Sequence, residues 1–421
     1  MTGFFHQAGH LVCDGVDLRA IADAEGTPVY VYSAAALRDR FRALDEAFDG
    51  YPHALHYALK ANSNLAIGSL LQGLGSCADA NSVWEIEVAR RMGYAPHQIV
   101  FTGVGKSPAE LEHAVPLALK AINVESAGEL ARIEAIAARL GRPARVAVRI
   151  NPDIDARSHP HISTGLKINK FGVPVDAARE LLATLAGRPF LTLVAVHVHI
   201  GSQVTTLDPL RGAAQFVAGI ATELASAGMP LEYVDVGGGL GISYDGAPVL
   251  DIREYVQAVV EAVRPTGLPI VLEPGRSIVG PAGALLGRVI DLKPRNAISE
   301  FAVIDAGMTE LMRPALYNAF HRIEPAVASD AEPRHYEIVG PVCESSDVVG
   351  RDRMLPPLAI GDVLVIRDAG AYGAAMSSNY NRRPLPAEVL VDAGSWQVIR
   401  RRQTVDDMLA LETDASLAPA R

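Results

Sequence analysis

The chain has 421 residues, 38 of them basic and 48 acidic, and a formal net charge of −10. This length predicts roughly two or three domains, and the negative charge disfavours nucleic acids and anionic membrane surfaces as partners. Only six of the basic residues are lysines, at positions 60, 106, 120, 167, 170 and 293. A reaction that needs a lysine amine therefore has six candidates.

The three cysteines, Cys13, Cys77 and Cys343, do not form the pattern of a disulfide framework, and no Cys or His spacing indicates a zinc site. No apolar run approaches the ~18 residues of a membrane span, and the N-terminus lacks the pattern of a signal peptide. We therefore expect a soluble, cytoplasmic protein that binds no metal and acts on a small molecule.

Short apolar runs alternate with amphipathic stretches of helical length between about residues 53 and 275, which is typical of repeated βα units. The predicted strands are 53–59, 76–80, 98–102, 121–124, 144–150, 191–200, 232–236 and 269–273. The predicted helices include 82–92, 126–140, 207–227 and 252–263. Eight such strands favour a closed (β/α)8 TIM-like barrel. An open, doubly wound sheet is the alternative.

After residue 280 the pattern changes to β-branched runs separated by turn-rich segments, as at 301–304, 336–339, 363–366 and 388–391. This pattern predicts an all-β domain, a β-sandwich or β-barrel. Short extended pieces in the first 33 residues can complete it. We therefore expect a barrel over 34–280 and a β-domain formed by 1–33 and 281–421.

In a (β/α)8 barrel the chemistry lies at the carboxyl ends of the strands. Polar and glycine residues follow most of the predicted strands: Lys60, Asp79 with Ser82, Arg149 with Asn151, His199 with Ser202, Gly237 to Gly239, and Glu273 with Arg276. A lysine that ends an apolar strand can simply extend its amine into solvent. Lys60, however, is the one lysine predicted to end a barrel strand opposite a glycine-rich turn and a glutamate, and it is therefore the favoured candidate.

Two other patterns are weaker. The turn 237–241, GGGLG, can offer backbone N–H groups to a phosphate or can be a plain tight turn, and it lacks the GxGxxG spacing. Residues 105–107 resemble the end of a Walker A loop, but position 100 is not glycine. His197 and His199, two apart on a predicted strand, could bind a metal; the usual companion ligands are not placed as a set, so we expect no metal there.

Motifs in both halves of the chain resemble one enzyme family. YALKAN (57–62), HIGSQ (199–203), GGG (237–239) and EPGR (273–276) resemble the fold-type III pyridoxal-phosphate decarboxylases. LMRPALY (311–317), GPVCESSDV (340–348), GAYGAAMSSNYNRRP (370–384) and RRRQT (400–404) are similar to the diaminopimelate decarboxylase family. The resemblance runs nearly end to end. One departure is SVWE at 82–85, where family members often have Ser-Gly-Gly-Glu.

The resemblance implies a carboxy-lyase that converts meso-2,6-diaminopimelate to L-lysine and CO2 with pyridoxal 5'-phosphate, the last step of lysine biosynthesis. Lys60 would hold the cofactor as a Schiff base, His199 would stack on its ring, and Glu273 would keep its pyridine nitrogen protonated. The remaining implied cofactor-binding residues are Ser202, Gly237, Gly238, Gly239, Pro274, Gly275, Arg276 and Tyr372.

The resemblance also implies that Cys343, supplied by the second subunit of a homodimer, protonates the carbanion that remains after CO2 leaves. It would then act with Lys60 and His199 as a catalytic residue, next to Glu344 and Ser345 in the same motif. Most lone cysteines are packing residues, so this role rests on the motif.

Substrate selection requires partners for a distal carboxylate and a distal ammonium. Arg276 and Arg313 suit the carboxylate because a guanidinium offers a fork of donors, with Tyr317 and Tyr372 as hydroxyl partners. Glu344 suits the ammonium. A decarboxylase of the ornithine or arginine type, the main alternative, would have no use for Arg313. A pyridoxal-phosphate carrier without catalysis, a third possibility, would lack the β-domain.

The stretch 157–172, RSHPHISTGLKINKFG, is long and rich in Gly, Ser and His. It can be a mobile lid over the pocket or a plain solvated loop, and the sequence favours neither.

Overall fold

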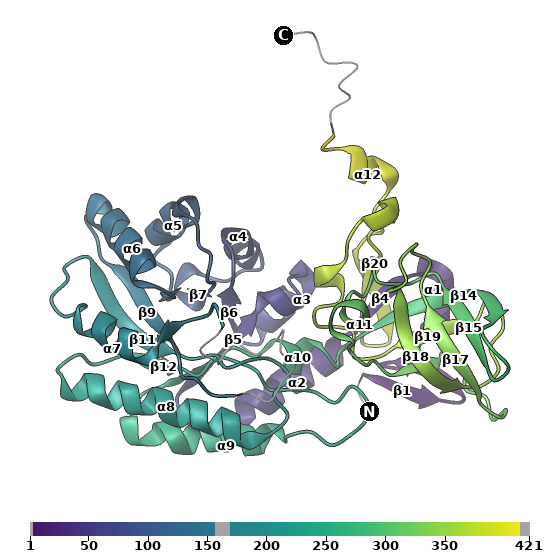
Figure 1. The fold of residues 1–421 in the computed structure, drawn as a ribbon, viewed down its shortest axis with the longest axis horizontal. Helices are drawn as coiled ribbons and strands as arrows, with labels where there is room; N and C mark the ends of the chain where they lie inside the picture. Colours follow the sequence, from purple (N-terminus) through teal and green to yellow (C-terminus); the bar gives the residue numbers. More distant parts are fainter. Residues whose placement is uncertain (1–2, 156–168, 413–421) are drawn as a thin grey trace, which may run out of the picture. The chain divides into compact units, whose positions relative to one another are not determined.

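The computed structural model describes residues 3–155 and 169–412 of the chain. These residues form two compact units, one over 37–280 and the other over 1–36 together with 281–421 (Figure 1). Within the described residues no helix combines the length and the apolar character needed to cross a membrane.

The unit over 37–280 is built on eight parallel strands: β5 (His53–Ala58), β6 (Cys77–Ala80), β7 (Ile99–Phe101), β8 (Ala121–Val124), β9 (Ala144–Asn151), β11 (Leu191–His197), β12 (Tyr233–Asp235) and β13 (Ile270–Leu272). Each strand pairs in parallel with its neighbour, and β13 pairs with β5, so the sheet closes on itself. The predicted (β/α)8 barrel is confirmed and the open sheet is wrong. A short strand, β10 (Val173–Pro174), adds to β9.

Helices precede, connect and follow these strands along the chain: α2 (Ala34–Glu46), α3 (Leu65–Gly73), α4 (Val83–Arg91), α5 (Pro108–Ala114), α6 (Ala127–Leu140), α7 (Val175–Ala183), α8 (Leu207–Ser226), α9 (Ile252–Val263) and α10 (Arg276–Val279). Several begin at a polar cap. The hydroxyls of Ser82 and Ser126 accept the backbone N–H three residues on, and Asp251 does the same for α9. Ser82 and Ser126 each come two residues after a barrel strand, β6 and β8, and so lie near the carboxyl ends of these strands.

The predicted strand ends needed correction at two places that matter for the site. β5 ends at Ala58, and Lys60 lies in the 3-10 turn η1 (Leu59–Ala61) rather than at the end of the strand. β11 ends at His197, three residues before the predicted end, so His199 lies beyond it. In both cases an apolar run continues past the last strand residue, because the chain stays buried as it turns over the rim of the barrel.

The second unit is sheet-rich. Its strands are β1 (Phe4–Gln7), β2 (His10–Cys13), β3 (Val16–Asp17), β4 (Val29–Ser33), β14 (Gly283–Pro294), β15 (Ser299–Ile304), β16 (Ile323–Pro325), β17 (Arg334–Val339), β18 (Val348–Leu355), β19 (Val363–Ile366), β20 (Ala387–Asp392) and β21 (Ser395–Arg400). β4 pairs with β14 on one side and β20 on the other, so an N-terminal strand lies inside a sheet formed mainly by C-terminal residues. Short helices complete the unit: α1 (Leu18–Glu25), α11 (Arg313–Tyr317) and α12 (Val405–Leu409).

The strand β14, which the sequence analysis missed, is the centre of this unit. It pairs with β4, β15 and β19 and has twelve residues. Its first half is buried and its second half is mostly exposed, so its sequence, GALLGRVIDLKP, shows no regular alternation. The unit's apolar core lies around this strand and includes Leu286, Val31, Val365 and Val389.

Candidate active site

Lys60 lies at the carboxyl end of the barrel strands. Its Nζ donates to Asp79 Oδ2 at 3.0 Å and to Asn81 Oδ1 at 3.3 Å. The Asp79 side chain is fully buried, whereas that of Lys60 is 33% exposed. The amine therefore has an anionic anchor beneath it and remains accessible from the mouth of the barrel.

Glu85 continues this hydrogen-bonded chain. Its Oε2 accepts the backbone N–H of Asn81 at 2.6 Å, and the Asn81 side-chain amide donates to Asp79. Burial raises the pKa of Glu85 from 4.5 to about 7, against the opposing effect of the hydrogen bond from Asn81. Hydrogen bonds thus link Lys60 in η1, Asp79 in β6, Asn81 just after β6 and Glu85 in α4.

The triple-glycine turn that follows β12 is packed against its neighbours too tightly for any side chain. A Cβ atom would lie 2.4 Å from Val198 O at Gly237, 2.3 Å from Glu273 O at Gly238 and 2.6 Å from Gly201 O at Gly239. Gly237 and Gly239 also have positive φ angles, 68° and 110°. The turn therefore needs all three glycines, for conformation and for space.

His199 is hydrogen-bonded to this glycine turn. Its Nδ1 accepts the backbone N–H of Gly238 at 3.1 Å, which leaves the ring proton on Nε2 in the neutral form. Burial holds the pKa of His199 well below its usual range, and the positive charges of Lys60 and Arg149 lower it further. His199 is therefore a neutral, fixed ring.

Glu273 follows β13 and is buried with two other titratable side chains. One ligand atom each of His197, Asp235 and Glu273 lies within 4.8 Å of the others. His197 Nε2 is 3.4 Å from Glu273 Oε2, while Asp235 Oδ1 accepts the backbone N–H of Gly237 at 2.9 Å. This cluster also has the donor set of a metal site, although it includes His197 and not His199 of the pair considered from the sequence.

Arg276 opens α10 directly after Gly275. Its Nε and Nη2 donate to Ser202 Oγ at 3.3 and 3.0 Å, and its Nη1 donates to Tyr244 Oη at 2.5 Å. A Cβ atom at Gly275 would lie 3.0 Å from Ala61 Cβ, next to Lys60 in sequence. Five of the predicted cofactor residues, Lys60, Ser202, Glu273, Gly275 and Arg276, therefore belong to one set of neighbouring strand ends.

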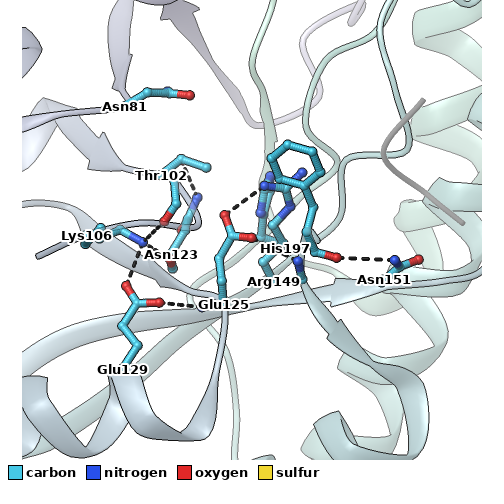
Figure 2. Close-up of polar contacts among 12 residues, drawn as sticks. Asn81, Thr102, Lys106, Asn123, Glu125, Glu129, Arg149, Asn151 and His197 are labelled. Atoms are coloured by element: carbon cyan, nitrogen blue, oxygen red, sulfur yellow. Dashed lines mark hydrogen bonds and ion pairs between the residues drawn. The ribbon is translucent and has the colours of Figure 1, made fainter. Parts of the chain in front are cut away.

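The sequence analysis missed a chain of buried ion pairs at the ends of β7, β8 and β9 (Figure 2). Lys106 Nζ donates to Glu129 Oε1, Asn123 O and Gly103 O at 2.6–2.7 Å. Glu129 Oε2 accepts the backbone N–H of Glu125, and Glu125 Oε1 accepts Arg149 Nη1 at 2.8 Å. The sequence does carry a signal for these pairs, since charged residues end or follow three otherwise apolar runs.

The predicted lid falls largely outside the described residues, which exclude 156–168, and so do its Lys167, His159 and His161. The residues that follow are tied to the ion-pair chain. Gly172 N donates to Glu125 Oε2 at 2.9 Å, and Phe171 lies under the Arg149 guanidinium at 4.9 Å.

The remaining predicted site residues belong to the other unit. Cys343 is exposed and accepts a hydrogen bond from Asn381 Nδ2 at 3.2 Å, and the adjacent Glu344 accepts one from Tyr380 Oη at 2.6 Å. Their loop is fixed by the buried Asp347, whose side chain accepts the backbone N–H groups of Met308 and Val342.

Arg313, at the start of α11, is buried, and its Nη1 contacts His321 Nε2 at 2.7 Å. Tyr317 ends the same helix. Tyr372 has a φ of 57°, a conformation uncommon for a residue with a side chain.

The barrel residues fit pyridoxal phosphate. Glu273 Oε1 is buried and has no donor among the described residues, as a partner for a protonated ring nitrogen requires. The glycine turn 237–239 offers backbone N–H groups where side chains are excluded, and Lys60 supplies an accessible amine. These features agree with the donor set for the cofactor that the sequence resemblance implies.

Comparisons with known proteins also indicate a pyridoxal-dependent decarboxylase. The sequence profile of the family described as "Pyridoxal-dependent decarboxylase, pyridoxal binding domain" matches residues 34–280. The diaminopimelate decarboxylase of Pseudomonas aeruginosa is 44% identical, over 98% of this chain and 99% of its own. Among solved structures, diaminopimelate decarboxylase from Helicobacter pylori complexed with L-lysine is 44% identical with a TM-score of 0.90, covering 94% of this chain and 98% of that one. The enzyme from M. jannaschii in co-complex with L-lysine is 37% identical with a TM-score of 0.93, covering 99% of both chains.

Proposed function

The chain belongs to the diaminopimelate decarboxylase family of pyridoxal-dependent decarboxylases, and from this premise we propose the roles of its individual residues. The enzyme releases CO2 from meso-2,6-diaminopimelate and forms L-lysine, with pyridoxal phosphate as its cofactor. When bound, pyridoxal phosphate supplies a ring that takes up the electron pair left by the departing carboxylate. The observation that carries the residue assignment is the meeting of Lys60, His199, the glycine turn and the unpaired oxygen of Glu273 at one end of the barrel.

Lys60, Glu273 and His199 hold the cofactor in this proposal. Lys60 provides the amine that binds it covalently, since its Nζ is anchored by Asp79 and remains partly exposed. Glu273 presents Oε1 to the ring nitrogen and keeps a proton on it. His199 would pack against one face of the ring as an uncharged side chain, because burial lowers its pKa.

The phosphate is bound by backbone N–H groups of Gly237, Gly238 and Gly239 and by the segment that begins at Pro274 and includes Gly275 and Arg276. Ser202 orients Arg276 through the two hydrogen bonds to its Oγ. Tyr372 adds a hydroxyl donor.

Charged side chains recognise the distal amino-acid group of the substrate. Arg276 and Arg313 bind its carboxylate, Tyr317 and Tyr372 donate hydroxyl hydrogen bonds, and Glu344 binds its ammonium. Arg313 is buried and held by His321, so its guanidinium is already oriented before substrate arrives.

Cys343 delivers the proton that replaces the lost carboxyl group, and it comes from the partner subunit of a homodimer. The exposure of Cys343 and of its neighbours 344–346 supports a partner-facing position. We place the cofactor on 34–280 and assign 1–33 and 281–421 to the dimer interface and the remaining active-site residues. We place the enzyme in the cytoplasm, which agrees with three cysteines that are all free.

The test compares CO2 release from meso-diaminopimelate, lysine, arginine and ornithine under the same conditions with the purified, pyridoxal-phosphate-saturated protein. We expect CO2 from diaminopimelate and rates at least about a hundredfold lower from the other three, because substrates that lack a distal carboxylate would make no ion pair with the Arg313 guanidinium. Arg313→Gln should reduce the ratio between the rate with diaminopimelate and the rates with the other three substrates. Faster release from ornithine or arginine would replace the substrate assignment with the related decarboxylase class.

A further inference from the structure

His197 is a fully buried histidine that the proposed reaction does not yet use. It ends β11, its side chain is 0% exposed, and neither ring nitrogen has a hydrogen-bond partner among the described residues. Burying an imidazole without hydrogen-bond partners costs free energy, so a functional role is expected for His197. Its nearest charged neighbour is Glu273, with Nε2 and Oε2 3.4 Å apart.

The strand register explains why these groups meet. His197 lies opposite Asp235 on β12 and opposite Arg149 on β9, and Glu273 follows the next strand, β13. The barrel strands therefore bring His197, Asp235 and Glu273 together in one buried cluster, in which one ligand atom of each residue lies within 4.8 Å of the others. Charge interactions with Lys60 and His199 also lower the pKa of Glu273, and His56 lies close enough to Glu273 for a charge interaction.

The two carboxyl groups of the cluster behave differently. Burial and the negative charge of Glu273 hold the pKa of Asp235 well above its usual range, which favours its protonated form. Burial, the largest single effect, would also raise the pKa of Glu273, but His197, Lys60 and His199 together lower it, with His197 contributing most, and the pKa lies below its usual range. The protonated form is thus favoured at Asp235 and the ionised form at Glu273.

Glu273 needs a counter-charge if it is to remain ionised in this surrounding. Lys60 Nζ is committed to Asp79 at 3.0 Å, and Arg149 is committed to Glu125. His197 faces Oε2 and leaves Oε1, the oxygen without a donor, for another group.

We propose that His197 is a positioning residue of this enzyme: it is the counter-charge that keeps Glu273 ionised and directs Oε1 toward the ring nitrogen of pyridoxal phosphate. This proposal rests on the cofactor orientation given under the proposed function. His197 touches neither the cofactor nor the substrate. It acts through Glu273.

The test measures binding of two cofactors to the full-length apoenzyme: pyridoxal phosphate and 1-deazapyridoxal phosphate, which has C–H in place of the ring nitrogen. The wild-type protein should prefer pyridoxal phosphate, because an ionised Glu273 bonds to the protonated nitrogen. His197→Gln should weaken binding of pyridoxal phosphate by about tenfold to a hundredfold, the range for one charge-assisted hydrogen bond. Its affinity for the deaza analogue should change less than about threefold.

The matched control is His53→Gln. His53 is at the opposite end of β5, where its ring stacks on Phe48 and contacts Asp45, and its replacement should leave the preference between the two cofactors unchanged. In a Glu273→Gln background, His197→Gln should have no further effect on the preference. If His197→Gln does not fold, His197→Asn carries the same measurement.

Equal losses for both cofactors would show a merely structural His197 and overturn the proposal, and so would an unchanged preference. A stoichiometric metal ion lost in His197→Gln would overturn it in favour of a metal site formed by the same three residues. A wild-type protein that binds neither cofactor would instead contradict the proposed function, so the two failures are distinguishable.

Discussion

At the scale of single residues, burial sets the protonation of Glu85, which ends the hydrogen-bonded chain from Lys60 through Asp79 and Asn81. The carboxyl of Glu85 accepts the Asn81 backbone N–H in a largely enclosed position, and its pKa rises to about 7. In an unfolded chain the same group titrates near 4.5. Between these two values the folded protein holds a proton that the unfolded chain has lost, so rising pH favours unfolding.

We therefore predict that Glu85 makes the folded protein less stable as the pH rises from about 5 to about 8, by up to about 3 kcal/mol. Glu85→Gln keeps an acceptor for Asn81 but does not titrate, and should remove this part of the pH dependence. Urea unfolding of both proteins across the range gives the difference directly, since all other titrating groups are shared. Parallel stability curves for the two proteins would contradict the assigned pKa.

The sequence was enough to select Lys60 as the candidate cofactor lysine, but it did not predict the surroundings of Lys106. Lys60 was selected because it follows an apolar run opposite a glycine turn, which the βα pattern alone can show. The burial of Lys106 could not be predicted, because its three partners come from 103, 123 and 129 and meet only when the barrel closes. For the same reason the roles of His197 and Asp235 could not be predicted, although both lie within predicted strands and end the observed strands β11 and β12.

At the scale of secondary structure, the ion-pair chain from Lys106 to Arg149 joins α6 to the ends of β8 and β9. The side chains of all four charged members, Lys106, Glu129, Glu125 and Arg149, are at most 6% exposed. Burial lowers the pKa of Lys106, and the negative charge of Glu129 opposes that effect. Removing one member leaves its partner buried and uncompensated, which is much more destabilising than the loss of a surface pair.

We predict that Lys106→Met lowers the free energy of unfolding by about 3 kcal/mol or more. Lys293→Met, at an exposed position of β14, should change it by less than about 0.5 kcal/mol. Adding Glu129→Gln to Lys106→Met should recover part of the loss, because an amide needs no counter-charge. The readout is the midpoint of chemical unfolding of the full chain. A Lys106→Met protein as stable as the Lys293→Met control would contradict the energetic role of the chain.

The elements of the barrel could be predicted more closely than those of the β-unit. The four predicted helices and seven of the eight predicted strands match to within one residue at each end, because buried parallel strands read as apolar runs and their helices have clear caps. β14 and β18 were missed. In both, buried and exposed stretches follow each other along the strand rather than alternating, so period-two reasoning has nothing to detect.

At the scale of the whole molecule, the central question is where each active site finds its proton donor. Lys60 and Cys343 lie in different compact units of the chain. The proposed homodimer supplies Cys343 to the site of the partner, so every active site would combine one residue from each subunit. Closed two-fold symmetry then gives two identical composite sites per dimer.

Lys60→Ala and Cys343→Ala are each expected to lose nearly all decarboxylation, the first without an amine for the cofactor and the second without a proton donor. In a mixed dimer of the two variants, one site receives both intact residues and the other receives neither. Random exchange of subunits produces mixed dimers in half of the population, so co-expression should restore about a quarter of wild-type activity. Pairing Lys60→Ala with the double variant Lys60→Ala/Cys343→Ala should restore none. If the first pair also stays inactive while differently tagged subunits co-purify as mixed dimers, both residues act within one subunit and the shared-site proposal is wrong.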